Sequence, residues 1–217
     1  MDAIIPAHNE QATVGGVASA VVLSHLFRRV TVVDDGSTDE TGTRAAQAGA
    51  EVLRLDPNRG KAEAMLAAVV QSDADAFAFF DADLIGFRPE HAVSLADHFD
   101  AGFDMVCGLR DYGLLNVFSA VMPLMTGERI VRRWVLEALP ATCWQGYAIE
   151  TAMNYVVDSN GGSTCLVPMS GVRIINKVSK VGWFEGMIAN IRMLRQMNDA
   201  GSALRRSEGG TCSVQQR

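Results

Sequence analysis

Two aspartates separated by one residue, Asp81 and Asp83, follow directly after the hydrophobic run 76–80. Such a run predicts a buried strand, and two carboxylates can converge where the chain turns at the end of a strand. Convergent carboxylates suit a hard divalent cation such as Mg²⁺ or Mn²⁺, which takes further oxygens from water and from a diphosphate. The pattern predicts metal-assisted departure of a diphosphate, and the alternative is a solvated acidic turn in which Asp83 caps the next helix.

Two further polar clusters also follow predicted strands. Asp34 and Asp35 open the segment 34–39, whose carboxylates suit the base and the ribose hydroxyls of a nucleotide, unless the segment is a plain loop with helix caps. Lys61 follows the loop 56–60 and begins a predicted helix, so an ammonium lies beside a helix N-terminus, where anions bind favourably. The loop lacks the Gly-rich pattern of ATP- or GTP-hydrolysing P-loops, so we do not expect that chemistry.

The elements that must position these clusters alternate between strands and helices through the first hundred residues. The predicted strands are 3–5, 30–33, 51–54 and 76–80, and the predicted helices are 11–26 with Asn9 as its N-cap, a helix capped by Ser37 or Thr38 that runs to 48, and 61–71. This alternation is typical of βα units on a mostly parallel sheet. Open α/β sheets bind ligands at the carboxyl ends of their strands, which is where all three clusters fall.

The second half of the chain is less regular. It contains predicted strands at 103–107 and 163–168, an apolar helix through Phe118, and helices at 128–139, 147–160 and 182–197. The tail from Ser202 onward is polar and contains Gly and Ser, so we predict that residues 201–217 are disordered. Neither a repeat nor a second domain is evident.

Composition narrows the class of protein. With 217 residues, 48 % hydrophobic and 20 % charged, the chain has enough apolar sequence for one globular domain with a buried core. The net charge of −6, with a single dense basic cluster at Arg129, Arg132 and Arg133, argues against nucleic acid as a partner. The four cysteines form no CxxC pair, so they are expected to be free thiols in a reducing compartment.

No signal peptide is visible, and the apolar stretch 114–125 is shorter than the roughly 20 residues that span a bilayer. We therefore expect a cytoplasmic protein, either soluble or peripheral at the inner face of the membrane. The same stretch, together with the Met-rich helix predicted at 182–197, suits a core, a homodimer surface or a contact with a lipid acceptor.

Four motifs in order resemble those of the family 2 glycosyltransferases with the GT-A fold. They are Pro-Ala-x-Asn-Glu at 6–10, Val-Asp-Asp-Gly-Ser-Thr-Asp at 33–39, Asn-x-Gly-Lys at 58–61 and Asp-Ala-Asp at 81–83. The resemblance is strong over residues 3–110 and continues more weakly through 126–129 and 146–150. Within that family the chain looks similar to dolichyl-phosphate-mannose synthase-like and glucosyl-3-phosphoglycerate synthase-like enzymes.

The resemblance implies an α/β protein of GT-A type, a single domain with a Rossmann-like, mostly parallel sheet flanked by helices. Residues 1–110 would be the nucleotide-sugar-binding half, and 111–200 the acceptor-side half. The implied activity moves a hexose from a UDP- or GDP-sugar, with Mg²⁺ or Mn²⁺, to a hydroxyl-bearing acceptor or a phosphate such as a polyprenyl phosphate or a small phosphorylated metabolite. The implied donor-binding residues are Pro6, Ala7, Asn9, Glu10, Asp34, Asp35, Lys61, Asp81 and Asp83, of which Asp81 and Asp83 would also hold the metal.

Glu150 matches the acidic residue of the Gly-Tyr-x-x-Glu segment, which lies near the acceptor in the family. An inverting transfer needs a general base to remove the acceptor's proton, so Glu150 is the predicted catalytic residue unless it is a structural helix glutamate. Arg129 is the arginine that the motif places at an acceptor phosphate. A synthase of the phosphoglycerate type would instead retain the anomeric configuration, and this alternative stays open.

Two departures from the family patterns bear on the metal. Ile85 stands where dolichol-phosphate-type synthases often carry a glutamine, and Asn176 is the nearest counterpart of the late histidine that completes the metal site in phosphoglycerate relatives. Metal binding would therefore depend more on the donor diphosphate and water. A nucleotide-binding relative without catalysis remains an alternative, whereas a nucleotidyltransferase would need a Gly-rich basic loop in place of residues 8–10.

Overall fold

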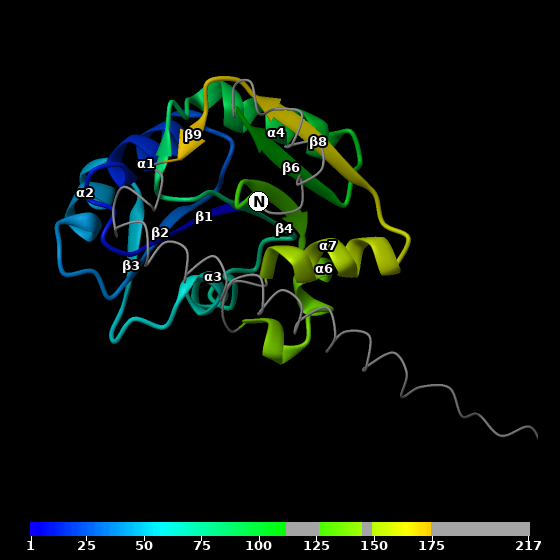
Figure 1. Ribbon diagram of the computed structural model, residues 1–217, viewed down its shortest axis with the longest axis horizontal. Helices are drawn as coiled ribbons and strands as arrows, with labels where there is room; N and C mark the ends of the chain where they lie inside the picture. The colour runs from blue at the N-terminus through cyan, green and yellow to red at the C-terminus, as the bar shows by residue number, and fades with distance from the viewer. Residues whose placement is uncertain (112–125, 145–148, 175–217) are drawn as a thin grey trace, which may run out of the picture.

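A seven-stranded sheet forms the centre of the protein (Figure 1) in a computed structural model that describes residues 1–111, 126–144 (Thr142 by its backbone only) and 149–174. The strands, in spatial order, are β3 (Glu51–Leu55), β2 (Val30–Asp35), β1 (Asp2–Ala7), β4 (Ala76–Phe79), β7 (Arg129–Arg132), β6 (Met105–Arg110) and β8 (Thr164–Met169). Neighbouring strands are parallel except at β7, which is antiparallel to both β4 and β6. The predicted mostly parallel sheet is confirmed.

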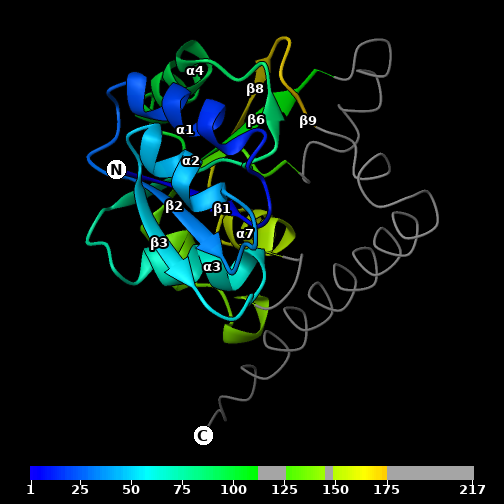
Figure 2. The ribbon, with the colours of Figure 1, turned by 90° about the vertical axis from the view of Figure 1, so that its left-hand side faces the viewer.

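Helices cover both faces of the sheet (Figures 1 and 2). One face carries α1 (Val14–Leu23), α2 (Thr41–Gln47) and α4 (Pro89–Asp100); the other carries α3 (Lys61–Val69), α6 (Arg133–Glu137), the 3₁₀ turn η3 (Ala141–Trp144) and α7 (Ile149–Ser159). Successive strand residues point to opposite faces, so Phe77 and Phe79 join the core beneath α3 while Ala78 and Phe80 join the core beneath α1. Burial on both faces explains why the run 76–80 is hydrophobic throughout.

The first two predicted helix starts are wrong by several residues. α1 begins at Val14 after Thr13, not after Asn9, and α2 begins at Thr41 after Glu40. Asn9 has a positive φ of 55°, and its side-chain oxygen accepts the backbone N–H of Thr38 at 2.9 Å. The polar side chains that looked like caps therefore tie two loops to each other.

The predicted helix at 128–139 is also wrong. Residues 129–132 form the strand β7, and only Arg133–Glu137 are helical, as α6. Ile130 and Val131 are both fully buried, because β7 lies between β4 and β6 with helices over each face of the sheet. A strand buried on both faces loses the alternation that would have distinguished it from a helix.

Helix α4, the 3₁₀ turn η3 and a short two-stranded ribbon were not predicted. Helix α4 begins at Pro89, and its apolar residues Ala92, Leu95, Ala96 and Phe99 recur at helical spacing, which is a signal that the sequence does contain. A two-residue ribbon pairs β5 (Leu84–Ile85) with β9 (Arg173–Ile174) outside the main sheet. Two-residue strands carry no periodicity from which they could be recognised.

Several predictions fall outside the described residues. These are the apolar helix through Phe118, the start of the helix at Tyr147, the helix at 182–197, Asn176 and the tail at 201–217. Among the helices that are described, none combines the length and the apolar character needed to cross a membrane.

Candidate active site

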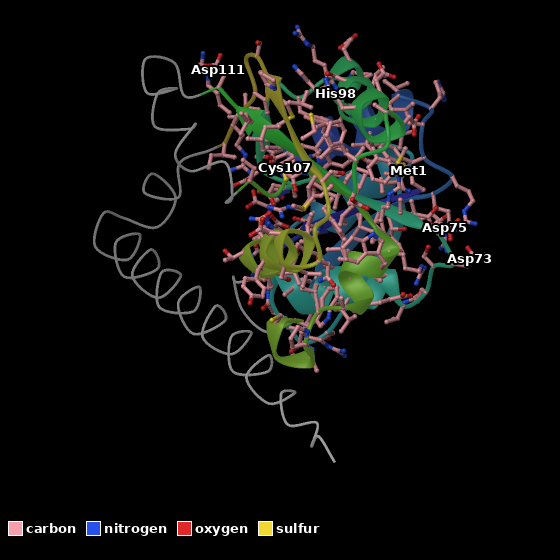
Figure 3. The ribbon with its side chains drawn as sticks, turned by 90° about the vertical axis from the view of Figure 1, so that its right-hand side faces the viewer. Met1, Asp73, Asp75, His98, Cys107 and Asp111 are labelled. Carbon is pink, nitrogen blue, oxygen red and sulfur yellow. The ribbon has the colours of Figure 1, made fainter. Side chains whose placement is uncertain are left out.

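The predicted polar clusters leave the sheet at one edge, the carboxyl ends of its parallel strands. β1 and β2 run in register, with Ala7 beside Asp34, so the segments that follow them start next to each other. In Figure 3, Asp111, which follows β6, lies at one side of the sheet, and Met1, Asp73 and Asp75, which precede β1 and β4, lie at the other. The site is therefore built at the edge where α/β sheets bind ligands.

At the centre of this edge Lys61 joins two carboxylates that are far apart in the sequence. Its Nζ lies 2.7 Å from Oδ1 of Asp81 and 2.6 Å from Oε1 of Glu150. Lys61 is the first residue of α3, Asp81 follows β4, and Glu150 lies in the first turn of α7. In Figure 2, α3 and α7 lie beside the ends of the central strands. The structure thus brings together three residues that the sequence analysis assigned to donor binding and catalysis.

Arg110 and Glu128 extend this cluster, and the sequence analysis missed both. Arg110, the last residue of β6, donates from Nη2 to the second oxygen of Asp81. Its Nε and Nη2 also bind the two oxygens of Glu128, each at 2.7 Å. Glu128 is completely buried and Arg110 is 7 % exposed. The available signal was a cation at the end of a strand, the same position that made Asp34 and Asp81 conspicuous.

The charges in this cluster set one another's protonation. Burial alone would raise the pKa of Asp81, but attraction to Lys61 and Arg110 outweighs it and holds that pKa well below the usual range. Burial would lower the pKa of Lys61, yet Asp81 and Glu150 raise it. Burial raises the pKa of Glu128, against the pull of Arg110 and with the repulsion of Asp81. Asp81 and Lys61 are consequently held in their charged forms.

Gly127 closes the remaining side of Asp81. A Cβ added to Gly127 would lie 2.3 Å from Oδ1 and 2.5 Å from both Cγ and Oδ2 of Asp81. A Cβ atom does not come this close to an atom to which it is not bonded, so only glycine fits while the carboxylate keeps this place. The segment 126–129 therefore abuts the aspartate by its backbone.

The loops after β1 and β2 are joined by hydrogen bonds. Ser37 Oγ accepts the backbone N–H of Asn9 at 3.0 Å, and Thr41 Oγ1 accepts that of Glu10 at 2.8 Å. Pro6 and Ala7 are buried within β1 just before these loops. The motif 6–10 thus supplies a fixed backbone at the edge of the sheet.

The two aspartates at the end of β2 are both bonded to protein. Asp34 is 1 % exposed and accepts Nη1 of Arg54 at 2.6 Å and the backbone N–H of Ser37 at 3.0 Å. Asp35 accepts the backbone N–H groups of Arg59 and Gly60, at 2.8 and 2.7 Å. These bonds give Asp34 a structural place in its turn and let Asp35 fix the loop that leads to Lys61.

The three arginines of the basic cluster do not lie together, because Arg129 begins β7 whereas Arg132 ends it and Arg133 begins α6. Arg129 is fully buried, and its guanidinium donates to the carbonyls of Thr126 and Glu150 and to Oδ1 of Asn154. This attaches α7 to the 126–129 turn and buries the guanidinium that was predicted to meet an acceptor phosphate. Arg132 pairs with Ala76 at the start of β4, so the end of β7 and α6 lie at the edge opposite the site.

The donor atoms at this edge fit one kind of metal ion. In the described parts of the chain no three His, Cys, Asp or Glu side chains are grouped to hold a metal. Both carboxylate oxygens of Asp81 accept hydrogen bonds from charged side chains, those of Lys61 and Arg110. Asp83, which is 9 % exposed, lies two residues further on. Carboxylate oxygens without a complete protein cage fit Mg²⁺ or Mn²⁺, which keep waters and take oxygens from substrate phosphates. They do not fit a structural zinc site, which needs four protein ligands.

Residues 2–147 match the family described as glycosyl transferase family 2. The chain belongs to this family. Among curated relatives, glucosyl-3-phosphoglycerate synthase of Mycolicibacterium smegmatis is 38 % identical over 95 residues, which cover 40 % of this chain and 31 % of the relative. A 4,4'-diaponeurosporenoate glycosyltransferase of Staphylococcus aureus is 29 % identical over 133 residues, which cover 57 % of this chain and 36 % of the relative. The matches thus span about a third of the length of these relatives.

Solved structures of glucosyl-3-phosphoglycerate synthase from Mycobacterium tuberculosis share the fold. A complex with Mn²⁺, UDP and glucosyl-3-phosphoglycerate superposes with a TM-score of 0.76 at 22 % identity, over 92 % of this glycosyltransferase family chain and 79 % of the other. A complex with Mg²⁺ and UDP gives a TM-score of 0.72 at 23 % identity, over 91 % and 79 % of the two chains. The predicted GT-A-type fold is confirmed.

Proposed function

We propose that this protein is a metal-dependent glycosyltransferase that moves a hexose from a UDP-sugar to a small phosphorylated acceptor. The observation that carries the proposal is the bridge of Lys61 between Asp81 and Glu150 at the carboxyl edge of the sheet of a family 2 domain. The UDP and Mn²⁺ in the related complex favour UDP over GDP, and the name of the relative glucosyl-3-phosphoglycerate synthase favours a phosphorylated metabolite over a polyprenyl phosphate.

Lys61, Asp81 and Asp83 have different roles at the donor in this proposal. The Lys61 ammonium is held in place by its two carboxylates, so it can meet the negative charge that develops on a departing diphosphate without reorganising. Asp81 and Asp83 lie at the turn after β4, where these two aspartates would hold the cation with the diphosphate. A bound Mg²⁺ or Mn²⁺ would supply Lewis-acid neutralisation of the leaving group.

The loops after β1 and β2 form the nucleotide wall in this proposal. Asn9 and Glu10 are fixed by hydrogen bonds to the loop after β2, and Asp35 is fixed by backbone N–H groups of the loop before α3. A wall that is already ordered before the nucleotide arrives lowers the entropic cost of orienting the donor. Asn9, Glu10 and Asp35, with the backbone of Pro6 and Ala7, are the residues that we assign to it.

The stereochemical course defines a second candidate. The predicted inverting transfer uses Glu150 as general base, whereas a retaining transfer in which the leaving diphosphate takes the acceptor's proton needs no protein base. Oε1 of Glu150 accepts a hydrogen bond from Lys61 at 2.6 Å, so this oxygen is occupied by an ammonium and not by an acceptor hydroxyl. This ion pair favours the retaining, glucosyl-3-phosphoglycerate synthase-like course, in which Glu150 holds Lys61.

Calorimetric titration with UDP, GDP, ADP and CDP, each with and without Mn²⁺, tests the donor site. We expect Mn²⁺-dependent binding of UDP by the wild type and its loss in Asp83→Ala. Asp73→Ala is the matched control, because Asp73 is an exposed aspartate at the opposite edge of the sheet. Equal binding of all four nucleotides, or binding that Asp83→Ala leaves intact, would overturn the donor assignment.

A transfer assay tests the reaction and its course. UDP-glucose, Mg²⁺ and 3-phosphoglycerate are incubated with the protein, and the anomeric proton of the product is read by NMR. An α-linked product from the α-linked donor identifies retention, and a β-linked product identifies inversion with Glu150 as base. Nucleotide binding without turnover on any phosphorylated acceptor would instead support the non-catalytic relative.

A further inference from the structure

The turn 169–172, which joins β8 to β9, holds the chain where it leaves Arg110. The backbone N–H of Asp111, the next residue, donates to the carbonyl of Val172 at 2.9 Å. Oδ2 of Asp111 accepts the backbone N–H of Gly171 at 3.1 Å. One side of the turn is therefore attached to the segment that carries Arg110 into the site.

The other side of the turn holds the segment that follows Asp83. β5 starts at the residue after Asp83, and it pairs with β9, which starts directly after the turn. Gly86 then passes so close to the turn that an added Cβ would lie 2.4 Å from the carbonyl oxygen of Gly171. Because this contact leaves no room for a side chain, a displacement of the turn is transmitted to the segment that anchors Asp83.

His91, in the first turn of α4, fixes the turn 169–172 from a third direction. Its Nδ1 lies 3.0 Å from the backbone nitrogen of Arg88, and its Nε2 lies 3.2 Å from the carbonyl oxygen of Ser170. A backbone N–H can only donate and a carbonyl can only accept, so Nδ1 is the acceptor and Nε2 carries the proton. The ring also lies against Phe87, with 5.7 Å between the ring centroids. Both bonds are therefore made together only by the neutral imidazole in one tautomer.

We propose that His91 is a positioning residue that holds the turn 169–172 against the segment after Asp83, and so keeps Asp83 where the metal and the diphosphate bind. The arrangement with both bonds of His91 made is called the closed arrangement. A proton added at Nδ1 would face the N–H of Arg88, so protonation breaks that bond and frees the ring to turn away from Ser170. The inference rests on the proposed function, because it assumes that a divalent cation and a nucleoside diphosphate bind beside Asp83.

The surroundings of His91 favour the neutral ring. Burial lowers its pKa below the ordinary value of 6.5, although the bond to Ser170 acts in the opposite direction; Arg88 lowers this pKa and Glu90 raises it. The charged residues in the first turn of α4 and beside the turn 169–172 are Arg88, Glu90, Asp111 and Arg173. When the turn is released the ring regains its ordinary pKa. The closed arrangement is therefore fully favoured above pH 6.5 and is weakened as the pH falls below that value.

Calorimetric titration with UDP-glucose and Mn²⁺ at about pH 7.5 and about pH 5.5 tests the inference. The diphosphate of UDP-glucose has no group that titrates in this range. The wild type should lose about three- to tenfold in affinity at the lower pH, because one pH unit below 6.5 weakens the closed arrangement by about tenfold. His91→Gln keeps one acceptor and one donor but takes up no proton, so it should match the wild type at pH 7.5 and keep that affinity at pH 5.5.

Two further variants separate the bond to Ser170 from the cap of α4. His91→Glu keeps an acceptor for the N–H of Arg88, as glutamate does at this helix position, but has no donor for Ser170. Residues that orient a metal ligand contribute about 10–100-fold to metal affinity, so His91→Glu should bind about tenfold more weakly at both pH values. His98→Gln is the matched control, since His98 lies on the same helix and its Nδ1 contacts the carbonyl of Ser94 within α4; it should follow the wild type at both pH values.

Urea unfolding shows whether each variant folds. If His91→Glu does not fold, Gly86→Ala takes its place, because its methyl group presses on the turn from the other side and should also weaken binding at both pH values. Wild-type affinity in a folded His91→Glu or Gly86→Ala would overturn the inference, as would a loss of affinity in His91→Gln that parallels the wild type when the pH falls. A wild type that binds no UDP-glucose with Mn²⁺ at pH 7.5 would overturn the proposed function, and the inference with it, whereas the preceding outcomes overturn the inference alone.

Discussion

Substitution of Gly127 by alanine tests the position of Asp81 without removing any functional group. The new methyl group would lie 2.3–2.5 Å from the carboxylate, and ordinary contact begins at 3.4 Å, so the two must move apart by about 1 Å. The carboxylate resists this movement because Lys61 and Arg110 hold its two oxygens. The alanine therefore displaces the aspartate together with its partners or shifts the backbone of residues 126–129.

A misplacement of about 1 Å in a catalytic constellation can cost about 100-fold in rate. We therefore expect Gly127→Ala to lower kcat/KM for UDP-glucose by about two orders of magnitude. Overpacking costs about 1–3 kcal/mol of unfolding free energy, so a protein of ordinary stability should still fold. The assays are initial rates of UDP release with 3-phosphoglycerate, calorimetric binding of UDP with Mn²⁺, and urea unfolding.

Gly16→Ala is the matched control. Gly16 lies within α1, nothing surrounds the position of an added Cβ within 4 Å, and alanine is favoured over glycine in a helix by about 1 kcal/mol. This variant should keep wild-type activity and gain slightly in stability. If Gly127→Ala behaved in the same way, with unchanged kcat/KM and UDP affinity, the placement of Asp81 against the 126–129 turn would be refuted.

Three further predictions concern single side chains. Burial would raise the pKa of Asp2, but hydrogen bonds from Arg28 and Ser72 lower it, so the charged form stabilises the fold above the ordinary aspartate pKa of 3.8 and this stability is lost as the pH falls through the lowered value. Between pH 5 and 2 the free energy of unfolding should therefore depend less on pH in Asp2→Asn than in the wild type, and parallel curves would contradict this. Lys61→Met leaves two carboxylates facing each other without their cation, and UDP affinity measured by calorimetry should fall by at least tenfold; unchanged affinity would remove Lys61 from the donor site. Glu150→Gln should lower kcat by less than about 100-fold and keep the acid limb of the pH–rate profile, whereas a larger loss without that limb would identify Glu150 as the general base.

The parallel half of the sheet could be predicted because its signals are local. Each strand from β1 to β4 contains a short apolar run that ends in polar residues, and a helical pattern was recognised after each of the first three. The rule that ligands bind at the carboxyl ends then placed Asp35, Lys61 and Asp81 at one edge without any knowledge of their distances. Their order along the chain was enough.

The rest of the site depends on pairings that no local pattern records. Arg110 and Glu128 come together because β7 runs antiparallel between β4 and β6, and the sequence analysis assigned β7 to a helix. With that strand misassigned, Arg129 was expected on an accessible helix face, whereas it lies fully buried beneath α7. Burial on both faces removes the period-2 signal, and the partner of a buried charge is decided by tertiary register.

The contact between Glu150 and Lys61 could not be predicted from the sequence either. The motif placed Glu150 near an acceptor and suggested a proton acceptor, but 89 residues separate it from the ammonium that binds it. Residue type and spacing indicated a carboxylate in the site. They did not indicate that Lys61 is its partner. Whether Glu150 acts as a general base or holds Lys61 in place depends on that partner.

The most direct test of the central claim is a time course of UDP-glucose, Mg²⁺ and 3-phosphoglycerate followed by ³¹P NMR, with wild type and Asp83→Ala in parallel. The account predicts that wild type releases UDP in step with the appearance of a glucosylated phosphoglycerate, and that chelation of the metal or the Asp83→Ala substitution stops both. UDP release at equal rates with and without metal, or unchanged turnover by Asp83→Ala, would contradict it.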